Sequence, residues 1–147
     1  MKWVLITVAV VIGVPALFYF GGLAYYSLVV NDRITKDLTE NSQGERANLV
    51  MLMTFPDGQQ LPMNYLREGN KVFAGADGRW WRAFREGDVS VTLLVKGEEL
   101  IGKASVVLDD PAYTKDVFTR LRPNVPKWLP DWLNANLIVI DLEENSR

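Results

Sequence analysis

The 147-residue sequence contains no cysteine and no histidine. The lack of cysteine excludes disulfides, thiol nucleophiles and thiolate metal ligands. The lack of histidine excludes Ser-His-Asp and Cys-His catalysis, an imidazole general base and the usual zinc sites. A P-loop and a Gly-x-Gly-x-x-Gly fingerprint after a strand are also missing. We therefore expect no metal site and assign no catalytic side chain; any chemistry would be carried by a group that the protein binds.

The sequence has no excess of positive charge. Its formal net charge is −2, so it lacks the basic footprint of a nucleic-acid-binding protein, and no nucleic-acid partner is expected. The carboxylate pairs Glu98-Glu99, Asp109-Asp110 and Glu143-Glu144 fall at a predicted turn, a helix cap and a tail. We interpret them as solvated groups without an acid–base role.

Charged residues are also absent from the long run between Trp3 and Asn31. A bilayer core requires about 20 apolar residues in a helix, and this run is longer. Trp3 at one end and Tyr25-Tyr26 at the other are typical of the two membrane interfaces. We predict a single transmembrane helix over 1–31. The alternative is a cleaved signal peptide, for which Gly22-Leu23-Ala24 offers a weak cleavage pattern.

Basic residues flank this run on both sides. Lys2 precedes it, and Arg33, Lys36 and Arg46 follow it. The positive-inside rule slightly favours a cytoplasmic C-terminal domain. The expectation is a single-pass membrane protein whose soluble domain lies in the cytoplasm.

The rest of the chain divides into a polar linker, 32–46, and a domain, 47–147, that alternates short apolar runs with turns. Asp110-Pro111 starts a helix with an N-cap carboxylate and a proline at the first helical position, and Pro123 ends it. Six strands are predicted: Leu49–Phe55, Gln59–Leu66, Lys71–Gly75, Val89–Val95, Leu100–Leu108 and Leu137–Leu142. The predicted fold is mainly β, a six-stranded antiparallel split β-barrel with one inserted helix.

The most unusual stretch runs from Val72 to Phe84. A short strand leads into Gly75-Ala76-Asp77-Gly78, and Trp80-Trp81 follow with arginines on either side. The glycine turn leaves backbone N–H groups bare, and the tryptophans and arginines could hold a flat, anionic ligand. The alternative is a hairpin corner whose tryptophans plug the core, because Trp is usually largely buried.

These segments together carry a resemblance to a known family. The series Pro62-Met63-Asn64-Tyr65-Leu66, a turn, a strand, Gly75-Ala76-Asp77-Gly78 and Trp80-Trp81-Arg82 resembles the deazaflavin-dependent nitroreductase family. Its members are split β-barrels related to the FMN-binding pyridoxamine-phosphate-oxidase-like barrels. The resemblance spans about Ala47 to Leu142.

The resemblance implies a cofactor site. In that family the strand around Pro62 lies against the isoalloxazine-like ring, and the small-residue turn with the following tryptophan flanks the cofactor tail. The implied cofactor is a deazaflavin or FMN, and the implied activity is hydride transfer to a small or quinone-like acceptor. The implied cofactor-binding residues are Pro62, Met63, Asn64, Gly75, Ala76, Asp77, Gly78, Trp80, Trp81 and Arg82.

The sequence departs from that family at one loop. Where the family has a basic loop for the phosphate tail, this chain has Pro56-Asp57-Gly58-Gln59-Gln60, which carries no cation. Arg79, Arg82 and Arg85 could compensate, or they could form a solvated basic edge. The alternative function is therefore a non-catalytic, membrane-anchored binding or scaffolding module. A homodimer is a candidate assembly for so small a barrel.

A third hypothesis concerns the segment Lys127 to Trp132. It interleaves Trp128 and Trp132 with prolines, a pattern that suits a belt lying on the membrane interface. The alternative is that these tryptophans plug the barrel.

Overall fold

A computed structural model of the chain describes residues 22, 25, 29–126, 128, 130 and 135–143. Most of the predicted transmembrane helix, 1–31, lies outside these residues. Within the described part, no helix is both long enough and apolar enough to cross a bilayer. The transmembrane helix therefore stays a prediction. Most of the proposed interfacial belt, 127–132, also falls outside the described residues, apart from the exposed Trp128 and Pro130.

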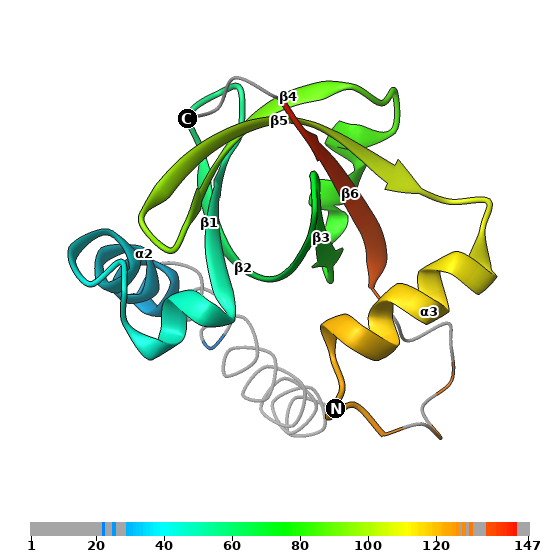
Figure 1. Cartoon of the computed structure of the whole chain (residues 1–147), viewed down its shortest axis with the longest axis horizontal. Coiled ribbons are helices and arrows are strands. Elements are labelled where there is room, and N and C mark those ends of the chain that lie inside the picture. Colours follow the sequence, from blue (N-terminus) through cyan, green and yellow to red (C-terminus); the bar gives the residue numbers. More distant parts are fainter. Residues whose placement is uncertain are drawn as a thin grey trace, which may run out of the picture.

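Six antiparallel strands close into a barrel in the order β1-β2-β3-β6-β5-β4 (Figure 1). The helix α3 (Pro111–Leu121) lies between the last two strands of the sequence. The predicted fold class is thus confirmed for the barrel and its inserted helix. The strands are β1 (Val50–Thr54), β2 (Gln60–Glu68), β3 (Lys71–Ala76), β4 (Val89–Val95), β5 (Glu98–Val107) and β6 (Asn136–Leu142).

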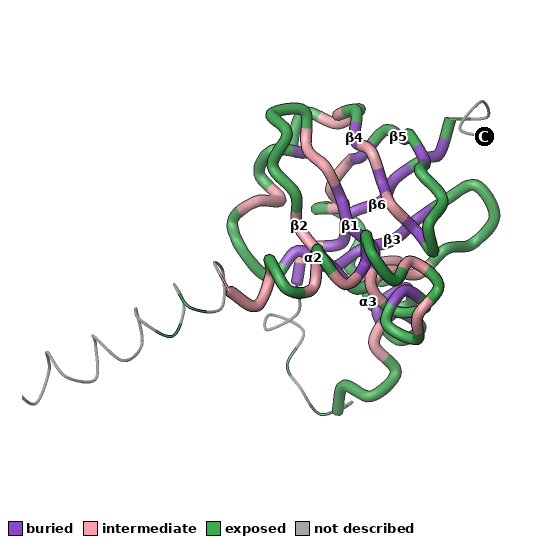
Figure 2. Tube along the Cα trace, turned by 90° about the vertical axis from the view of Figure 1, so that its left-hand side faces the viewer, coloured by how far each residue is buried: buried purple, intermediate pink, exposed green. Residues whose placement is uncertain are grey.

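The barrel interior is filled by the inward-facing residues of all six strands. Side chains alternate between the two faces of a strand, so Met51 and Met53 of β1 point inward and are fully buried. Leu93 of β4 and Ile138 of β6 lie in the same core. In Figure 2 buried stretches follow β1, β3 and β6, whereas the connecting loops are mostly exposed. A small barrel packed in this way is a solid core and not a channel.

The helix α3 covers the outer face of β3 and β6. The Asp110 carboxylate accepts a hydrogen bond from the backbone N–H of Tyr113 at 2.9 Å, which is the predicted N-cap. Val117, Phe118 and Leu121 are buried in a second apolar cluster, outside the barrel. The cap and this buried stripe together explain why the segment is helical.

A second helix, α2 (Asn31–Glu40), covers a different side of the barrel (Figure 1). Its Leu38 packs against Leu52 of β1, and Ala47 of the short 3₁₀ helix η2 (Glu45–Asn48) joins them. The segment predicted as a linker therefore contains two short helices that pack on the barrel.

The strands β2 and β3 pair over only part of their lengths. Their pairing runs from Tyr65 opposite Ala74 to Glu68 opposite Lys71. Pro62 pairs with Leu52 of β1 and has no partner recorded in β3. Because proline has no N–H for a second ladder, this position suits it.

Gly102 of β5 provides a test of the barrel packing. A Cβ at this position would lie 2.6 Å from Cγ2 of Ile140 and 2.8 Å from the backbone oxygen of Asp141. We expect Gly102→Ala to lower the free energy of unfolding by about 1–3 kcal/mol, because the backbone of β6 would have to shift. Urea unfolding measures the loss. The control is Ile101→Ala, at a neighbouring residue that is 42% exposed, for which a smaller loss is expected. Wild-type stability for Gly102→Ala would contradict this packing.

Candidate functional site

The tryptophan segment forms a short 3₁₀ helix, η3 (Arg79–Phe84), at one end of the barrel. The Trp80 ring meets Phe55 and Phe84 edge-on, each at a centroid distance of 5.9 Å. Phe55 and Phe84 stack on each other at 5.5 Å. Trp80 therefore belongs to an aromatic cluster that closes this end of the barrel, as expected of a core plug.

The neighbouring Trp81 is in a different environment. The guanidinium of Arg85 lies 5.2 Å from its ring centroid, and that of Arg82 lies 5.8 Å away. Residues three apart eclipse each other in a 3₁₀ helix, so both arginines lie on the same side of η3. Cation–π attraction to the indole holds them there.

The three arginines of this segment, Arg79, Arg82 and Arg85, are not neutralised by ion pairs within the described part of the chain. Among the residues that the structure describes, no ion pair involves Arg79, Arg82 or Arg85. All three are exposed. Their positive charge is therefore available to an anionic ligand.

The turn between β1 and β2, which carries Asp57 and no cation, lies beside η3. Phe55, which contacts both Trp80 and Phe84, also fixes the turn: its N–H donates to Gln59 at 2.8 Å, and its carbonyl accepts from Gly58 at 2.9 Å. The exposed arginines of η3 thus stand at the same end of the barrel as the turn that carries no cation.

The small-residue turn is braced from outside by the C-terminal end of α3. A Cβ on Gly75 would lie 2.7 Å from Nη2 of Arg122 and 2.9 Å from Cε1 of Phe118. The missing side chain of Gly75 therefore makes room for these two groups. Arg122 in turn donates two hydrogen bonds to the Asp77 carboxylate, at 2.8 and 3.1 Å, and its guanidinium lies over Phe118 at 5.4 Å.

The remaining predicted residues are divided between the two faces of the barrel wall. Met63 and Ala76 point into the core and are buried. Pro62 lies opposite Leu52 on the outer face of β2, and Asn64 is exposed. The predicted cofactor-binding residues therefore do not share one surface. Some lie on the outer face of β2, two lie in the core, and the others lie in the turn held by Arg122 or in η3. That these residues bind a cofactor stays a prediction.

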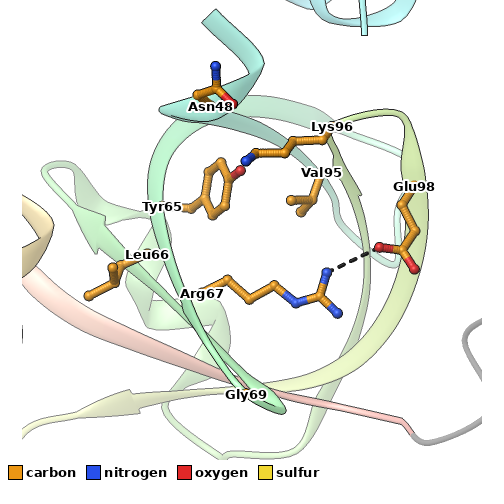
Figure 3. A pocket seen from close by; sticks show the side chains of 8 residues that line it. All are labelled: Asn48, Tyr65, Leu66, Arg67, Gly69, Val95, Lys96 and Glu98. Atoms are coloured by element: carbon orange, nitrogen blue, oxygen red, sulfur yellow. Dashed lines mark hydrogen bonds and ion pairs between the residues drawn. The ribbon is translucent and has the colours of Figure 1, made fainter. Parts of the chain in front are cut away.

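The opposite end of the barrel holds a cavity that the sequence interpretation missed. Its volume is about 550 Å³, and its wall includes Tyr65, Arg67 and Lys96 (Figure 3). One signal in the sequence pointed to it. Leu61, Met63 and Tyr65 occupy every second position of β2 and so share one face. The next residue on that face is Arg67, which places a cation after three largely apolar side chains.

The described part of the chain contains no group of three or more acidic, cysteine or histidine side chains that could hold a metal ion. The buried side-chain nitrogen and oxygen atoms of these residues all have hydrogen-bond partners.

No known family profile matches the sequence, and no curated protein matches it either. Solved structures do match. The structure is similar to that of an inferred pyridoxamine 5′-phosphate oxidase from Listeria innocua, with a TM-score of 0.53 and 17% sequence identity over 78% of this chain and 94% of that one. An inferred general stress protein 26 from Jannaschia sp. CCS1 matches at a TM-score of 0.49 and 12% identity, over 76% of this chain and 75% of that one. The likeness to the Listeria protein supports the six-stranded barrel fold alone.

The two tryptophans are expected to differ in their contribution to stability. Trp80→Ala removes the ring that packs on Phe55 and Phe84, and should cost about 2–4 kcal/mol of unfolding free energy. Trp81 is half-buried like Trp80 and also packs against the core, but its ring makes no aromatic pair among the described residues, so Trp81→Ala should cost less. Urea unfolding of the two variants measures both losses. Equal losses would contradict the distinction between a plug and a surface platform.

Proposed function

We propose that the chain is a membrane-anchored split-barrel oxidoreductase that binds a flavin-type cofactor, a deazaflavin or FMN. The acceptor in this proposal is a small or lipid-soluble molecule such as a quinone. The observation that carries the proposal is the pair Arg82 and Arg85, held on Trp81 without a carboxylate partner among the described residues. This pair provides the anion site that the turn Pro56 to Gln60 lacks.

The energetics of such a pair suit a phosphate. Hydrogen bonds to charged groups contribute about 1.5–3 kcal/mol each. Two of them together would change the dissociation constant by a factor of roughly 10² to 10⁴. The stacking of both guanidinium groups on Trp81 reduces the side-chain entropy that is lost when a ligand binds. The arginines of η3 would thus replace the cations of the family's basic loop.

The composition of the chain agrees with a cofactor-dependent activity. A bound flavin or deazaflavin supplies hydride transfer itself, so the protein needs neither histidine nor cysteine. The role of the chain's own residues is to bind and orient: Arg82 and Arg85 hold the anionic tail, and Pro62 and Asn64 offer the outer face of β2 to the ring. The fold is compatible with redox work, since the Listeria innocua protein with the same fold is named as an oxidase.

One observation favours the alternative of a non-catalytic binding module. Arg122 and Phe118 occupy the space above Gly75, and Arg122 also holds Asp77. The chain's own side chains therefore fill part of the surface that a cofactor tail would use. A barrel of this kind could have kept its fold and lost its ligand.

Cofactor binding separates the two functions. We expect the full chain, purified in detergent, to bind FMN or a deazaflavin, and to bind riboflavin more weakly because riboflavin has no phosphate. The variant Arg82→Gln/Arg85→Gln should bind FMN at least about tenfold more weakly. Flavin absorbance and fluorescence titrations measure these affinities. The control Arg33→Gln/Arg120→Gln also removes two positive charges, away from η3, and should bind as wild type. If no flavin binds at about 50 μM, the oxidoreductase proposal is wrong, and the non-catalytic binding module is favoured.

Thiol labelling tests the proposed membrane topology. Because the chain has no cysteine, an introduced thiol is the only one that can react. Glu99→Cys introduces a single thiol at an exposed position of β5. A maleimide that cannot cross membranes should label this thiol only after the cells are permeabilised, because the barrel is proposed to be cytoplasmic. Labelling in intact cells would place the barrel outside. Loss of the protein from the membrane fraction on an alkaline wash would contradict the anchor.

A further inference from the structure

The cavity at the other end of the barrel lies far from η3 along the strands. The strand β4 begins just after η3, at Val89, and ends at Val95, in the wall of the cavity. β1 runs in the opposite sense, because Thr54 pairs with Thr92 and Leu52 pairs with Leu94. We call this cavity the barrel mouth. Its wall includes Tyr65, Arg67, Val95, Lys96 and Glu98.

The size of the barrel mouth suits a small ligand. Its volume of about 550 Å³ falls within the range of roughly 300–1,000 Å³ that is usual for ligand pockets. Figure 3 shows Tyr65 and Arg67 of β2 facing Lys96 and Glu98 of the hairpin between β4 and β5 across this space. Such convergence of a few polar groups on one concave site is typical of ligand recognition.

The charges of the barrel mouth favour a monoanion. Arg67 and Lys96 bring two positive charges, and Glu98 brings one negative charge, which leaves one positive charge. Nη1 of Arg67 lies 3.1 Å from Oε2 of Glu98. Lys96 has no recorded carboxylate partner among the described residues. The ammonium of Lys96 is therefore the group that a ligand's anionic head would meet.

The backbone at Lys96 is unusual. Lys96 and Gly97 have φ values of 51° and 79°, as both central residues of a type I′ hairpin turn require. Asn, Asp and Gly are the residues that favour such positions, whereas lysine is uncommon in the left-handed region. A residue held in a sparsely populated conformation is a pointer to function when its surroundings fix it.

The surroundings do fix this turn. Nε2 of Gln43 donates to the backbone oxygen of Lys96 at 2.6 Å, and a Cβ on Gly97 would lie 2.7 Å from Oγ of Ser42. The segment after α2 thus clamps the turn from outside. In Figure 3 the Lys96 side chain extends from this turn across the barrel mouth towards Tyr65.

Tyr65 gives the barrel mouth a flat, neutral wall. Its hydroxyl donates to the backbone oxygen of Ala47 at 3.0 Å. Burial raises the pKa of Tyr65 above its ordinary value, and the nearby Arg67 opposes this to a smaller extent. The phenol therefore stays neutral at physiological pH, and its ring, with Val95, offers an apolar surface to a ligand's body.

We propose that the barrel mouth is a binding site for a small organic monocarboxylate with a flat apolar body. The carboxylate pairs with the Lys96 ammonium, and the body packs on Tyr65 and Val95. The site is separate from the proposed cofactor site and does not depend on it.

The experiment uses benzoate as the probe and benzamide, its neutral analogue, as the control ligand. Amide chemical shifts of the full chain in detergent micelles are followed as each compound is added. We expect benzoate to shift the signals of Tyr65, Lys96 and Gly97 saturably, and benzamide to leave them unchanged. Shifts confined to η3 would place the anion on Arg82 and Arg85, and would overturn the proposal. Equal shifts with benzamide, or none with benzoate, would overturn it as well.

A variant at Lys96 completes the test. Lys96→Asn replaces lysine by a residue that the turn prefers, so the melting temperature should hold or rise. Benzoate affinity should fall about tenfold or more, because one charged contact is lost. The matched control is Lys103→Asn on β5, which pairs with Ser90 at the far end of β4, and it should bind benzoate as wild type. If Lys96→Asn binds benzoate as tightly as the wild type, Lys96 does not contact the carboxylate, and the proposal is wrong.

Discussion

Closure of six strands around a filled interior is the constraint on which the rest of this structure depends. Met51, Met53, Leu93 and Ile138 are fully buried inside the barrel, and no water-filled channel is compatible with that packing. A ligand can therefore bind only at an end of the barrel or on its outer wall. This explains why the residues that could bind a ligand gather where the strands begin and end.

The two ends have opposite characters because different connections close them. At one end η3 packs Trp80 edge-on against the stacked rings of Phe55 and Phe84, and its arginines lie outside the aromatic cluster. At the other end the tight Lys96-Gly97 turn brings no aromatic side chain, and a cavity remains that Lys96 crosses without filling. A difference in loop composition on one scaffold thus produces a basic aromatic surface and a polar cavity.

Much of the fold followed from local patterns. Alternating apolar residues located the strands, and Asp110 with Pro111 located the start of α3. These features were accessible because each depends on neighbours within a few residues.

The contacts that define the candidate sites were not accessible in this way. Arg122 reaches Asp77 across 45 residues, and Arg67 reaches Glu98 across 31. Exposed polar residues carry no periodic signal that reports such partners. The packing of Leu38 of α2 on Leu52 was hidden for the same reason, because a short polar segment with one buried leucine resembles a linker.

The position of β6 has a consequence for how the protein is made. This strand lies between β3 and β5, and its register pairs Lys71 with Asp141, some 70 residues apart. Long-range pairing of this kind forms slowly, because loop closure must precede it. The barrel cannot close until residues 136–142 have left the ribosome, so during synthesis the inward faces of the first five strands stay exposed to water. Until the last strand pairs, exposed apolar faces and unpaired strand edges make the chain prone to aggregate.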